Sequence, residues 1–319
     1  MLKSKELLRN ILGGQVVTRP LFLPLTNTFA ARVAQLPLQD MFTNPTRLAN
    51  SLFRVQKLVG YDAIFLYNPV YMAAGLGCSV QWLEDFELPV FSTQAESTEA
   101  ISTNLANFEV KNFWQQDLAA SMLETCKRIA DVAAKQVGLV VGVTGPFTLL
   151  QQLQGRMPTQ ACQELTQAGE IVLSTAKSFA ELRPDLVVIM ESNQLTLNQE
   201  QVQELSNLMR PVANIVRYYN AFLGLHLPNN KPATFMDIDV LFYGEPTDLT
   251  ERKKDLVLGL ALDPNLFMQP KNELAEQIKR ILRISGKENI LISTLGELNH
   301  ATPVENLRQL QGIWETLSG

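Results

Sequence analysis

The sequence predicts an α/β fold, a (β/α)₈ barrel of the TIM type, and three observations lead to this prediction. Eight short runs rich in Val, Ile, Leu and Phe alternate with helical patterns, and eight parallel strands close such a barrel. Most of these runs are continuously apolar, as parallel strands covered by helices are. Within 137–150 an apolar run breaks at Thr144-Gly145-Pro146 and continues as a helix, which is typical of a βα unit.

The expected elements follow one another along the whole chain. Asn44 before Pro45 predicts a helix start, because asparagine caps free backbone N–H groups and proline suits the first helical position. Thr302-Pro303-Val304-Glu305 is a capping box that predicts a last helix running to about Leu317. The candidate strands lie at 16–23, 62–67, 137–144, 185–190, 221–226, 237–242, 256–261 and 289–294.

Two connections depart from the regular alternation. Residues 68–112 are too long for a simple loop, and the apolar runs at 78–83 and 86–91 predict a hairpin inserted after the second strand, as a rim or lid over the barrel mouth. Between His226 and Asp237 there is room for about one helical turn, so we expect a thin outer layer that a second subunit covers in a homodimer. No repeat or change in composition marks a boundary, so we expect one domain over 1–319.

Composition and charge argue against several classes of protein. The chain has 319 residues, 46 % of them hydrophobic and 18 % charged, so it can bury a large core. A net charge of −5 without a basic cluster argues against binding to nucleic acid or to an anionic membrane. The sequence has neither a signal-peptide pattern nor a long apolar span. Three widely separated cysteines predict a reducing compartment, and hence a cytoplasmic protein: Cys78, Cys126 and Cys162.

Polar residues follow the predicted strands at the end where barrels of this type carry their active sites. Both histidines, His226 and His300, fall there, which favours function, although a histidine at a strand end often only binds a loop carbonyl. Glu191 and Glu245 are candidates for general acid–base catalysis, with pairing to a nearby cation as the alternative. Four amides suit a neutral ligand with several heteroatoms: Asn27, Asn68, Asn193 and Asn299.

Six segments resemble one family, in order and at fitting spacings across nearly the whole chain. They lie at 19–24, 60–63, 75–80, 144–149, 262–264 and 302–307, and include Arg19-Pro20-Leu21-Phe22-Leu23-Pro24 and Thr144-Gly145-Pro146-Phe147-Thr148-Leu149. These segments resemble the uroporphyrinogen decarboxylase superfamily, which includes corrinoid-dependent methyltransferases. The resemblance implies a distorted (β/α)₈ barrel and, for the methyltransferase branch, a partner protein that carries the corrinoid.

The chain departs from the decarboxylase pattern at three places. The resemblance implies two arginines after the first strand, an acid after the second and a tyrosine after the Gly-Pro segment. This chain instead has Leu25-Thr26-Asn27-Thr28-Phe29, Asn68 and Gln152 at those places. Burying a substrate carboxylate without a cation costs several kcal/mol, so ordinary decarboxylation of uroporphyrinogen is not expected.

The chain also departs from the zinc pattern of the methyltransferase branch. That pattern implies His-x-Cys after the fifth strand and a further cysteine after the eighth. Here His226 is followed by Leu227 and Pro228, and residues 295–299 hold no cysteine. We therefore expect no zinc; if zinc is bound, the replacement ligands are His226, Glu297 and His300, with Glu191.

We therefore expect an enzyme of the methyltransferase branch that acts on a small or medium-sized ligand, with a corrinoid protein as its partner. The expected catalytic residues are His226, Glu191 and Glu297. Two alternatives stay open: a divergent tetrapyrrole decarboxylase that uses Arg32, Arg156 or Arg217, and a non-catalytic binding protein on the same barrel. The expected substrate-binding residues are Asn27, Asn68, Thr144, Gly145, Gln152, Asn193, Asn299 and His300.

Overall fold

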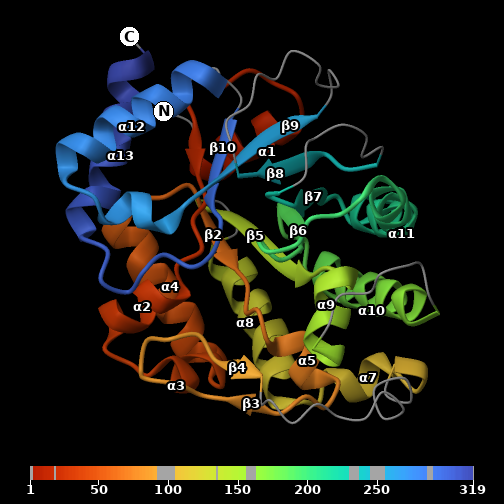
Figure 1. Cartoon of the computed structure of the whole chain (residues 1–319). Coiled ribbons are helices and arrows are strands. Elements are labelled where there is room, and N and C mark those ends of the chain that lie inside the picture. Colours follow the sequence, from red (N-terminus) through yellow and green to blue (C-terminus); the bar gives the residue numbers. More distant parts are fainter. Residues whose placement is uncertain are drawn as a thin grey trace.

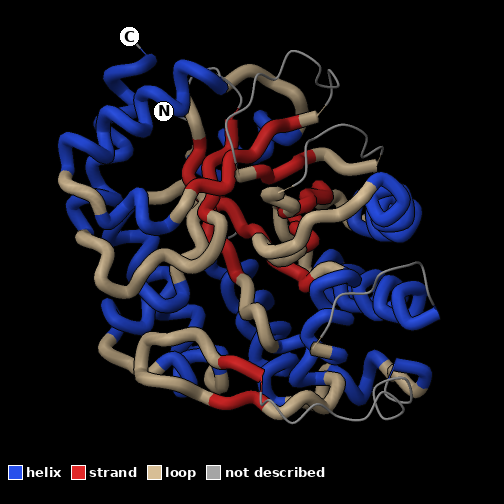
Figure 2. Tube along the Cα trace, viewed as in Figure 1, coloured by secondary structure: helices blue, strands red, loops and turns tan. Residues whose placement is uncertain are grey.

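Eight parallel strands form a nearly closed barrel surrounded by helices, which confirms the predicted architecture (Figure 1; Figure 2). The computed structural model describes residues 3–17, 19–91, 105–133, 136–155, 163–229, 237–244, 256–285 and 290–318. Each predicted strand overlaps one strand of the barrel. The barrel strands are β1 (Leu21–Phe22), β2 (Ala63–Leu66), β5 (Gly138–Thr144), β6 (Leu186–Met190), β7 (Phe222–His226), β8 (Val240–Tyr243), β9 (Val257–Leu262) and β10 (Ile290–Thr294). Their order in the sheet is β1-β10-β9-β8-β7-β6-β5-β2.

The first helix packs against the amino ends of β2 and β5. The other helices lie around the outside of the sheet. The apolar faces of the outer helices meet the outward side chains of the strands and form the larger core. The helices of the described residues are α1 (Ser4–Leu12), α2 (Asn27–Ala34), α3 (Leu38–Phe42), α4 (Pro45–Val59), α5 (Tyr71–Gly75), α7 (Val110–Phe113), α8 (Asp117–Ala133), α9 (Pro146–Gln154), α10 (Gln163–Ala180), α11 (Gln199–Tyr218), the short 3₁₀ helix η1 (Pro264–Met268), α12 (Lys271–Ser285) and α13 (Val304–Ser318).

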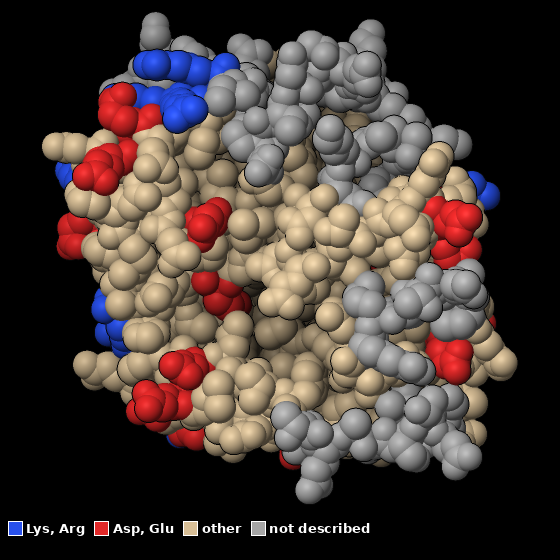
Figure 3. Space-filling model, in the orientation of Figure 1, with Lys and Arg blue, Asp and Glu red and all other residues tan. Residues whose placement is uncertain are grey.

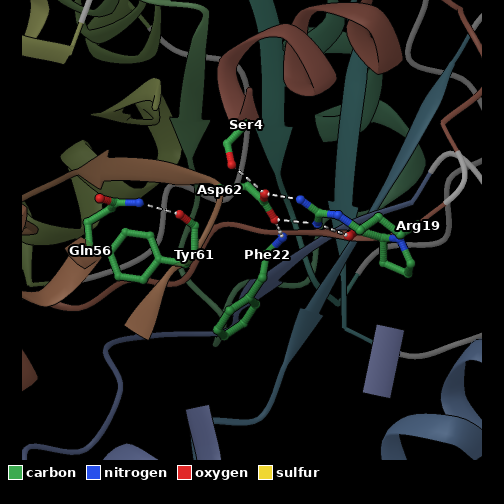
Figure 4. Close-up of polar contacts among 7 residues, drawn as sticks. Ser4, Arg19, Phe22, Gln56, Tyr61 and Asp62 are labelled. Atoms are coloured by element: carbon green, nitrogen blue, oxygen red, sulfur yellow. Dashed lines mark hydrogen bonds and ion pairs between the residues drawn. The ribbon is translucent and has the colours of Figure 1, made fainter. Parts of the chain in front are cut away.

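A buried aspartate joins the two ends of the sheet, β1 and β2. Asp62, 3 % exposed, accepts the backbone N–H of Phe22 at 2.9 Å, and its own N–H donates to the Phe22 carbonyl at 2.9 Å. Its carboxylate also accepts from the Arg19 guanidinium at 2.6 and 3.0 Å and from the Ser4 hydroxyl at 3.0 Å (Figure 4). One side chain therefore supplies hydrogen bonds across the seam of the barrel.

A second aspartate anchors α1 across the amino end of the barrel. Asp185 is fully buried and accepts the backbone N–H of Leu139 at 3.0 Å. Lys5 and Arg9, both on α1, reach its carboxylate at 3.2 and 3.1 Å. Because α1 covers the amino ends of the strands, the carboxyl ends are left as the open face.

The interior of the barrel is filled by side chains rather than forming a pore. Tyr67 follows β2 and packs over Gly142 of β5, where an added Cβ would lie 2.6 Å from the tyrosine ring. Phe242 occupies the equivalent space over Gly259 of β9. The two glycines thus let large aromatic rings fill the narrow interior, and Tyr67 marks the floor of the open face.

The inserted hairpin is present after β2, as predicted. Its two strands, β3 (Val80–Gln81) and β4 (Val90–Phe91), pair antiparallel, with Val80 opposite Phe91. Figure 1 shows the hairpin beside the helices that follow β1 and β2. The predicted thin layer at 230–236 lies outside the described residues.

The two predicted helix starts have different outcomes. The Asn44 side chain accepts from the backbone N–H groups of Thr46 and Arg47, both at 3.1 Å, so the predicted cap is confirmed. The predicted capping box at Thr302 does not form the start of the last helix, which begins two residues later, at Val304. The Thr302 hydroxyl instead donates to the sulfur of Met268 at 3.5 Å. None of the described helices is long and apolar enough to cross a membrane.

Candidate functional site

A cavity of about 260 Å³ lies at the carboxyl ends of the strands. It brings together three residues predicted to be catalytic, Glu191, His226 and Glu297, and two predicted to bind substrate, Gln152 and Asn193. Among the described residues on this face, Figure 3 shows acidic side chains beside the central hollow and Lys and Arg toward the margin. The described residues that line the cavity are Leu25, Tyr67, Pro69, Leu88, Thr148, Gln152, Met190, Glu191, Ser192, Asn193, His226, Leu295, Gly296 and Glu297.

Glu191 binds the amino end of a neighbouring helix. It follows β6, is 2 % exposed, and accepts the backbone N–H groups of Phe147 at 3.2 Å and of Thr148 at 2.8 Å, in the first turn of α9. The Thr148 hydroxyl donates to the same carboxylate. Burial raises the pKa of Glu191 to about 7, and the donors from Thr148 and Phe147 only partly offset that rise. Glu191 can therefore gain or lose a proton near neutral pH.

Gly145 makes the position of Glu191 possible. A Cβ at Gly145 would lie 2.3 Å from Cδ of Glu191, inside the contact distance of real atoms. The Gly145 N–H also donates to the carbonyl of Met190 at 2.8 Å, which holds the two strand ends together. Gly145, predicted to bind substrate, thus contacts the site through Glu191, and the close approach explains why no larger residue fits there.

Glu297 is held in the same way by the amino end of a second helix, α2. Its carboxylate accepts the backbone N–H of Asn27 at 2.6 Å and that of Thr28 at 3.4 Å, in the first turn of α2. The Asn27 side-chain amide donates to it at 2.6 Å and to the carbonyl of Tyr67 at 2.7 Å. Burial raises the pKa of Glu297 to about 7, against the lowering effect of the Asn27 and Thr28 donors. Two helix amino ends therefore each hold one carboxylate of the cavity.

His226, the last residue of β7, is a buried neutral base. Its Nδ1 lies 3.4 Å from the Glu191 carbonyl oxygen, and its Nε2 makes no hydrogen bond to any residue that the structure describes. Because a carbonyl only accepts, we assign the proton to Nδ1, which leaves Nε2 as an acceptor. Burial lowers the pKa of His226 to about 4, although the carbonyls of Glu191 and Thr294 favour the protonated ring. His226 is therefore uncharged at neutral pH.

The remaining amides predicted for the mouth have different surroundings. Gln152 donates through Nε2 to the carbonyl of Pro69 at 2.9 Å, and its buried Oε1 has no partner. Asn68 accepts the backbone N–H of Val70 at 3.0 Å and is buried next to the site without lining it. Asn193 is exposed at the rim, where its carbonyl accepts from the Asn229 side chain at 2.5 Å.

Three other predicted residues lie away from the cavity lining. Thr144, the last residue of β5, is fully buried, and its hydroxyl has no hydrogen-bond partner among the described residues. Asn299 is exposed, and its side chain accepts the backbone N–H of Ala301 at 2.8 Å in a local turn. His300 stacks on Phe86 with ring centroids 5.5 Å apart, beside a separate cavity of about 360 Å³ next to the hairpin. Glu245 and Arg156 are outside the described residues.

The side chains of this site do not fit a zinc ion. Among the described lining residues, His226 is the single nitrogen ligand and no cysteine is present, and His300 lies beside a different cavity. Cys126 is buried in the packing of α8. Among the residues that the structure describes, no group of three or more His, Cys, Asp or Glu side chains is placed to hold a metal ion.

Sequence reasoning missed three polar residues of the cavity, Tyr67, Thr148 and Ser192. Tyr67 ends the second predicted strand, so its position alone was a signal that it faces the mouth. Thr148 lies in the first turn of the helix after Gly145-Pro146, where free N–H groups attract an anion. The apolar lining residues carry no such signal, because Leu and Met at strand ends are equally typical of the core.

Comparisons with known proteins show the same fold. A methyltransferase from Methanosarcina mazei superposes with a TM-score of 0.80 at 19 % identity, over 100 % of both chains. A B12-independent methionine synthase from Shewanella sp. W3-18-1, in complex with selenomethionine, matches at 0.51 and 12 % identity, over 85 % of this chain and 88 % of that one. At such identities the two structures establish the fold. Among curated proteins, none matches in sequence. The family model of uroporphyrinogen decarboxylase (URO-D) matches residues 3–314, and the chain therefore belongs to the URO-D family.

Proposed function

We propose that this protein is an enzyme that transfers a methyl group to or from a small ligand in the central cavity, with a corrinoid on a partner protein as the other methyl carrier. The URO-D family and the cavity at the carboxyl ends of the strands support an enzyme. The fold shared with the Methanosarcina mazei methyltransferase supports methyl transfer. The observation that carries this choice is the lining, in which the described residues supply two carboxylates and no Lys or Arg.

This lining disfavours decarboxylation of a tetrapyrrole. Such a substrate carries several carboxylates, and each one buried without a cation costs several kcal/mol. Two of the arginines that were candidates for this role are engaged elsewhere. Arg217 pairs with Asp239 at 2.8 Å before β8, at the amino end of the barrel, and Arg32 lies over the Phe29 ring. A cavity of about 260 Å³ is also slightly smaller than the pockets of ~300–1,000 Å³ that hold drug-sized ligands.

The residues of the cavity can manage the protons of a methyl transfer. When a heteroatom of the ligand gains a methyl group it loses its proton, and in the reverse direction it regains one. Glu191 and Glu297 are suited to hold that proton because the pKa of each lies near 7. His226 offers Nε2 as a neutral acceptor that orients the reacting N–H or S–H group. The corrinoid would supply the methyl group in one direction and accept it in the other.

An anaerobic assay with methylcob(III)alamin tests this proposal. The protein is mixed with methylcob(III)alamin and, separately, a reduced pterin, a primary amine or a thiol. Loss of the methylcobalamin absorbance and the mass of the methylated acceptor are measured. We expect methyl transfer to one acceptor, and a rate lowered by about 10²-fold or more in Glu191→Gln, the range for losing an acid–base group.

Glu84→Gln is the matched control, because Glu84 is exposed beside the hairpin cavity and we expect the wild-type rate. Failure of methyl transfer with every acceptor, together with decarboxylation of uroporphyrinogen III, would establish the decarboxylase alternative. Failure of both reactions would leave a non-catalytic binding protein.

A further inference from the structure

We infer that the ligand of the central cavity presents a protonated nitrogen with N–H donors to Glu191 and Glu297, and an apolar portion to the leucine and methionine walls. This inference deepens the proposed function, because it names the chemical class of the ligand that would exchange the methyl group. Only the reaction of this ligand rests on the proposed function. Its binding preference is argued from the cavity itself.

The first argument is charge. Glu191 and Glu297 both face the cavity, and their partners in the protein are uncharged backbone N–H groups, a hydroxyl and an amide. In the described part of the lining no Lys or Arg balances them. Two carboxylates in a site of low dielectric attract a cation strongly and repel an anion by a similar amount. The cavity is therefore complementary to a positive charge.

The second argument is hydrogen bonding. Two buried polar atoms of the cavity lining have no partner among the described residues, Oε1 of Gln152 and Nε2 of His226. The second polar atom of each side chain shows which role the orphaned atom has. Nε2 of Gln152 donates to the Pro69 carbonyl, and Nδ1 of His226 lies against the Glu191 carbonyl. Both orphaned atoms are therefore acceptors. Since buried polar groups are nearly always satisfied, a ligand that donates hydrogen bonds fits them, and an acceptor-only ligand does not.

The third argument is the protonation of the surroundings. Among the described residues, the other titratable groups that face the two carboxylates are His226, Tyr61 and Tyr67. Burial lowers the pKa of His226 to about 4 and raises the pKa of both tyrosines, so all three are uncharged at neutral pH. Since none of these described neighbours is charged, the protonation of the two carboxylates responds to the charge of the ligand. A cation lowers their pKa and releases protons, whereas an anion raises it and takes protons up.

The fourth argument is the shape and polarity of the walls. The remaining lining is largely apolar, so the ligand needs a compact hydrocarbon part as well as a polar head. One aromatic ring with a short arm is within the size of a cavity of about 260 Å³. The apolar lining residues are Leu25, Pro69, Leu88, Met190 and Leu295.

Three probes of matched shape test this inference: benzylammonium, benzyl alcohol and benzoate. Each is titrated into the wild-type protein by isothermal calorimetry near pH 7, in two buffers of different ionisation enthalpy, which counts the protons exchanged. We expect benzylammonium to bind at least about tenfold more tightly than benzyl alcohol, which corresponds to ~1.4 kcal/mol. We expect it to release protons into the buffer, and benzoate to bind most weakly. Equal binding of the three, or tightest binding of benzoate with proton uptake, would overturn the inference.

Two variants assign the preference to the carboxylates. In Glu191→Gln and in Glu297→Gln we expect the preference for benzylammonium over benzyl alcohol to fall to about threefold or less, with fewer protons released. Glu84→Gln, outside the lining, keeps the wild-type preference. Gln152→Leu removes one orphaned acceptor and weakens benzylammonium binding without changing the number of protons released. If a glutamine variant does not fold, the proton count on the wild-type protein decides alone.

The outcomes for ligand class and for reaction are separable. Cation-selective binding without methyl transfer to any amine, pterin or thiol would keep the ligand class and remove the proposed function. Methyl transfer to an anionic acceptor, with benzoate bound more tightly than benzylammonium, would keep the proposed function and remove the ligand class.

Discussion

Glu191 and His226 are joined to each other twice across neighbouring strand ends. The backbone N–H of Glu191 donates to the His226 carbonyl at 3.0 Å, and Nδ1 of His226 lies 3.4 Å from the Glu191 carbonyl oxygen. The first contact belongs to the register of β6 and β7, and the second sets the tautomer of the imidazole. The position of the acid and the accepting atom of the base are thus determined together.

Replacing Glu191 by glutamine is expected to flatten the pH dependence of stability. The pKa of Glu191 rises from an ordinary 4.5 to about 7 in the folded protein. As the pH increases, this carboxyl therefore loses its proton at a lower pH in the unfolded chain than in the folded protein. The free energy of unfolding therefore falls between about pH 4.5 and 7, by up to a few kcal/mol, and Glu191→Gln lacks this fall. Urea unfolding at about pH 5 and about pH 7.5 measures the difference. The exposed control Glu84→Gln should run parallel to the wild type, and an E191Q curve as steep as the wild-type curve would contradict the raised pKa.

Gly145→Ala is expected to destabilise the protein and to disturb the site. The new Cβ would lie 2.3 Å from Cδ of Glu191, so the carboxylate must leave the first turn of α9. Overpacking of this kind costs about 1–3 kcal/mol, and binding to the cavity should weaken as well. Gly312→Ala is the control, because nothing lies near that exposed position of α13 and alanine there should stabilise by about 0.5–1 kcal/mol. Chemical denaturation of both variants measures these changes. A G145A variant as stable as the wild type would contradict the prediction.

Asp62→Asn is expected to weaken the seam between β1 and β2. The substitution removes the charge partner of Arg19 and one acceptor for the Phe22 N–H or the Ser4 hydroxyl. Breaking a buried pair costs 3–5 kcal/mol, and since Arg19 is 28 % exposed we expect about 2–3 kcal/mol. Asp40→Asn removes the exposed pair with Arg47 and should cost less than about 1 kcal/mol. Equal loss of unfolding free energy in the two variants would show that Asp62 has no special role.

Metal analysis should find less than one zinc ion per chain in protein purified without added metal. The reason is that no thiolate or second imidazole lies beside His226 among the described residues of the cavity, and thiolates are what hold zinc tightly. A chelator should leave the unfolding temperature unchanged. Zinc near one per chain that is lost in His226→Ala would instead establish His226 as a ligand.

Uroporphyrinogen III should not be decarboxylated at a rate typical of enzymes. The expectation rests on the cavity lining, where the described residues offer no Lys or Arg to the substrate carboxylates. Chromatography of the porphyrins formed after oxidation measures the product. Coproporphyrin at enzymatic rates would contradict the prediction.

The sequence predicted the elements of the barrel because those signals are local. Continuous apolar runs such as 185–190 predict buried strands, and β6 lies at Leu186–Met190. The cap at Asn44 was predictable for the same reason, since its partners are two and three residues away. Once the strands are parallel, their carboxyl ends must meet, which placed Glu191 and His226 at one face before any contact was known.

Tertiary structure alone decided what each polar residue does at that face. Glu191 finds its donors 43 and 44 residues earlier, and Glu297 finds Asn27 at a separation of 270. The same long-range packing turns His300 onto Phe86 instead of into the central cavity. Local patterns determine which residues form strands and helices, because those depend on neighbours a few positions apart. Charge, protonation and ligand preference depend on burial and on partners that only the closed barrel brings together.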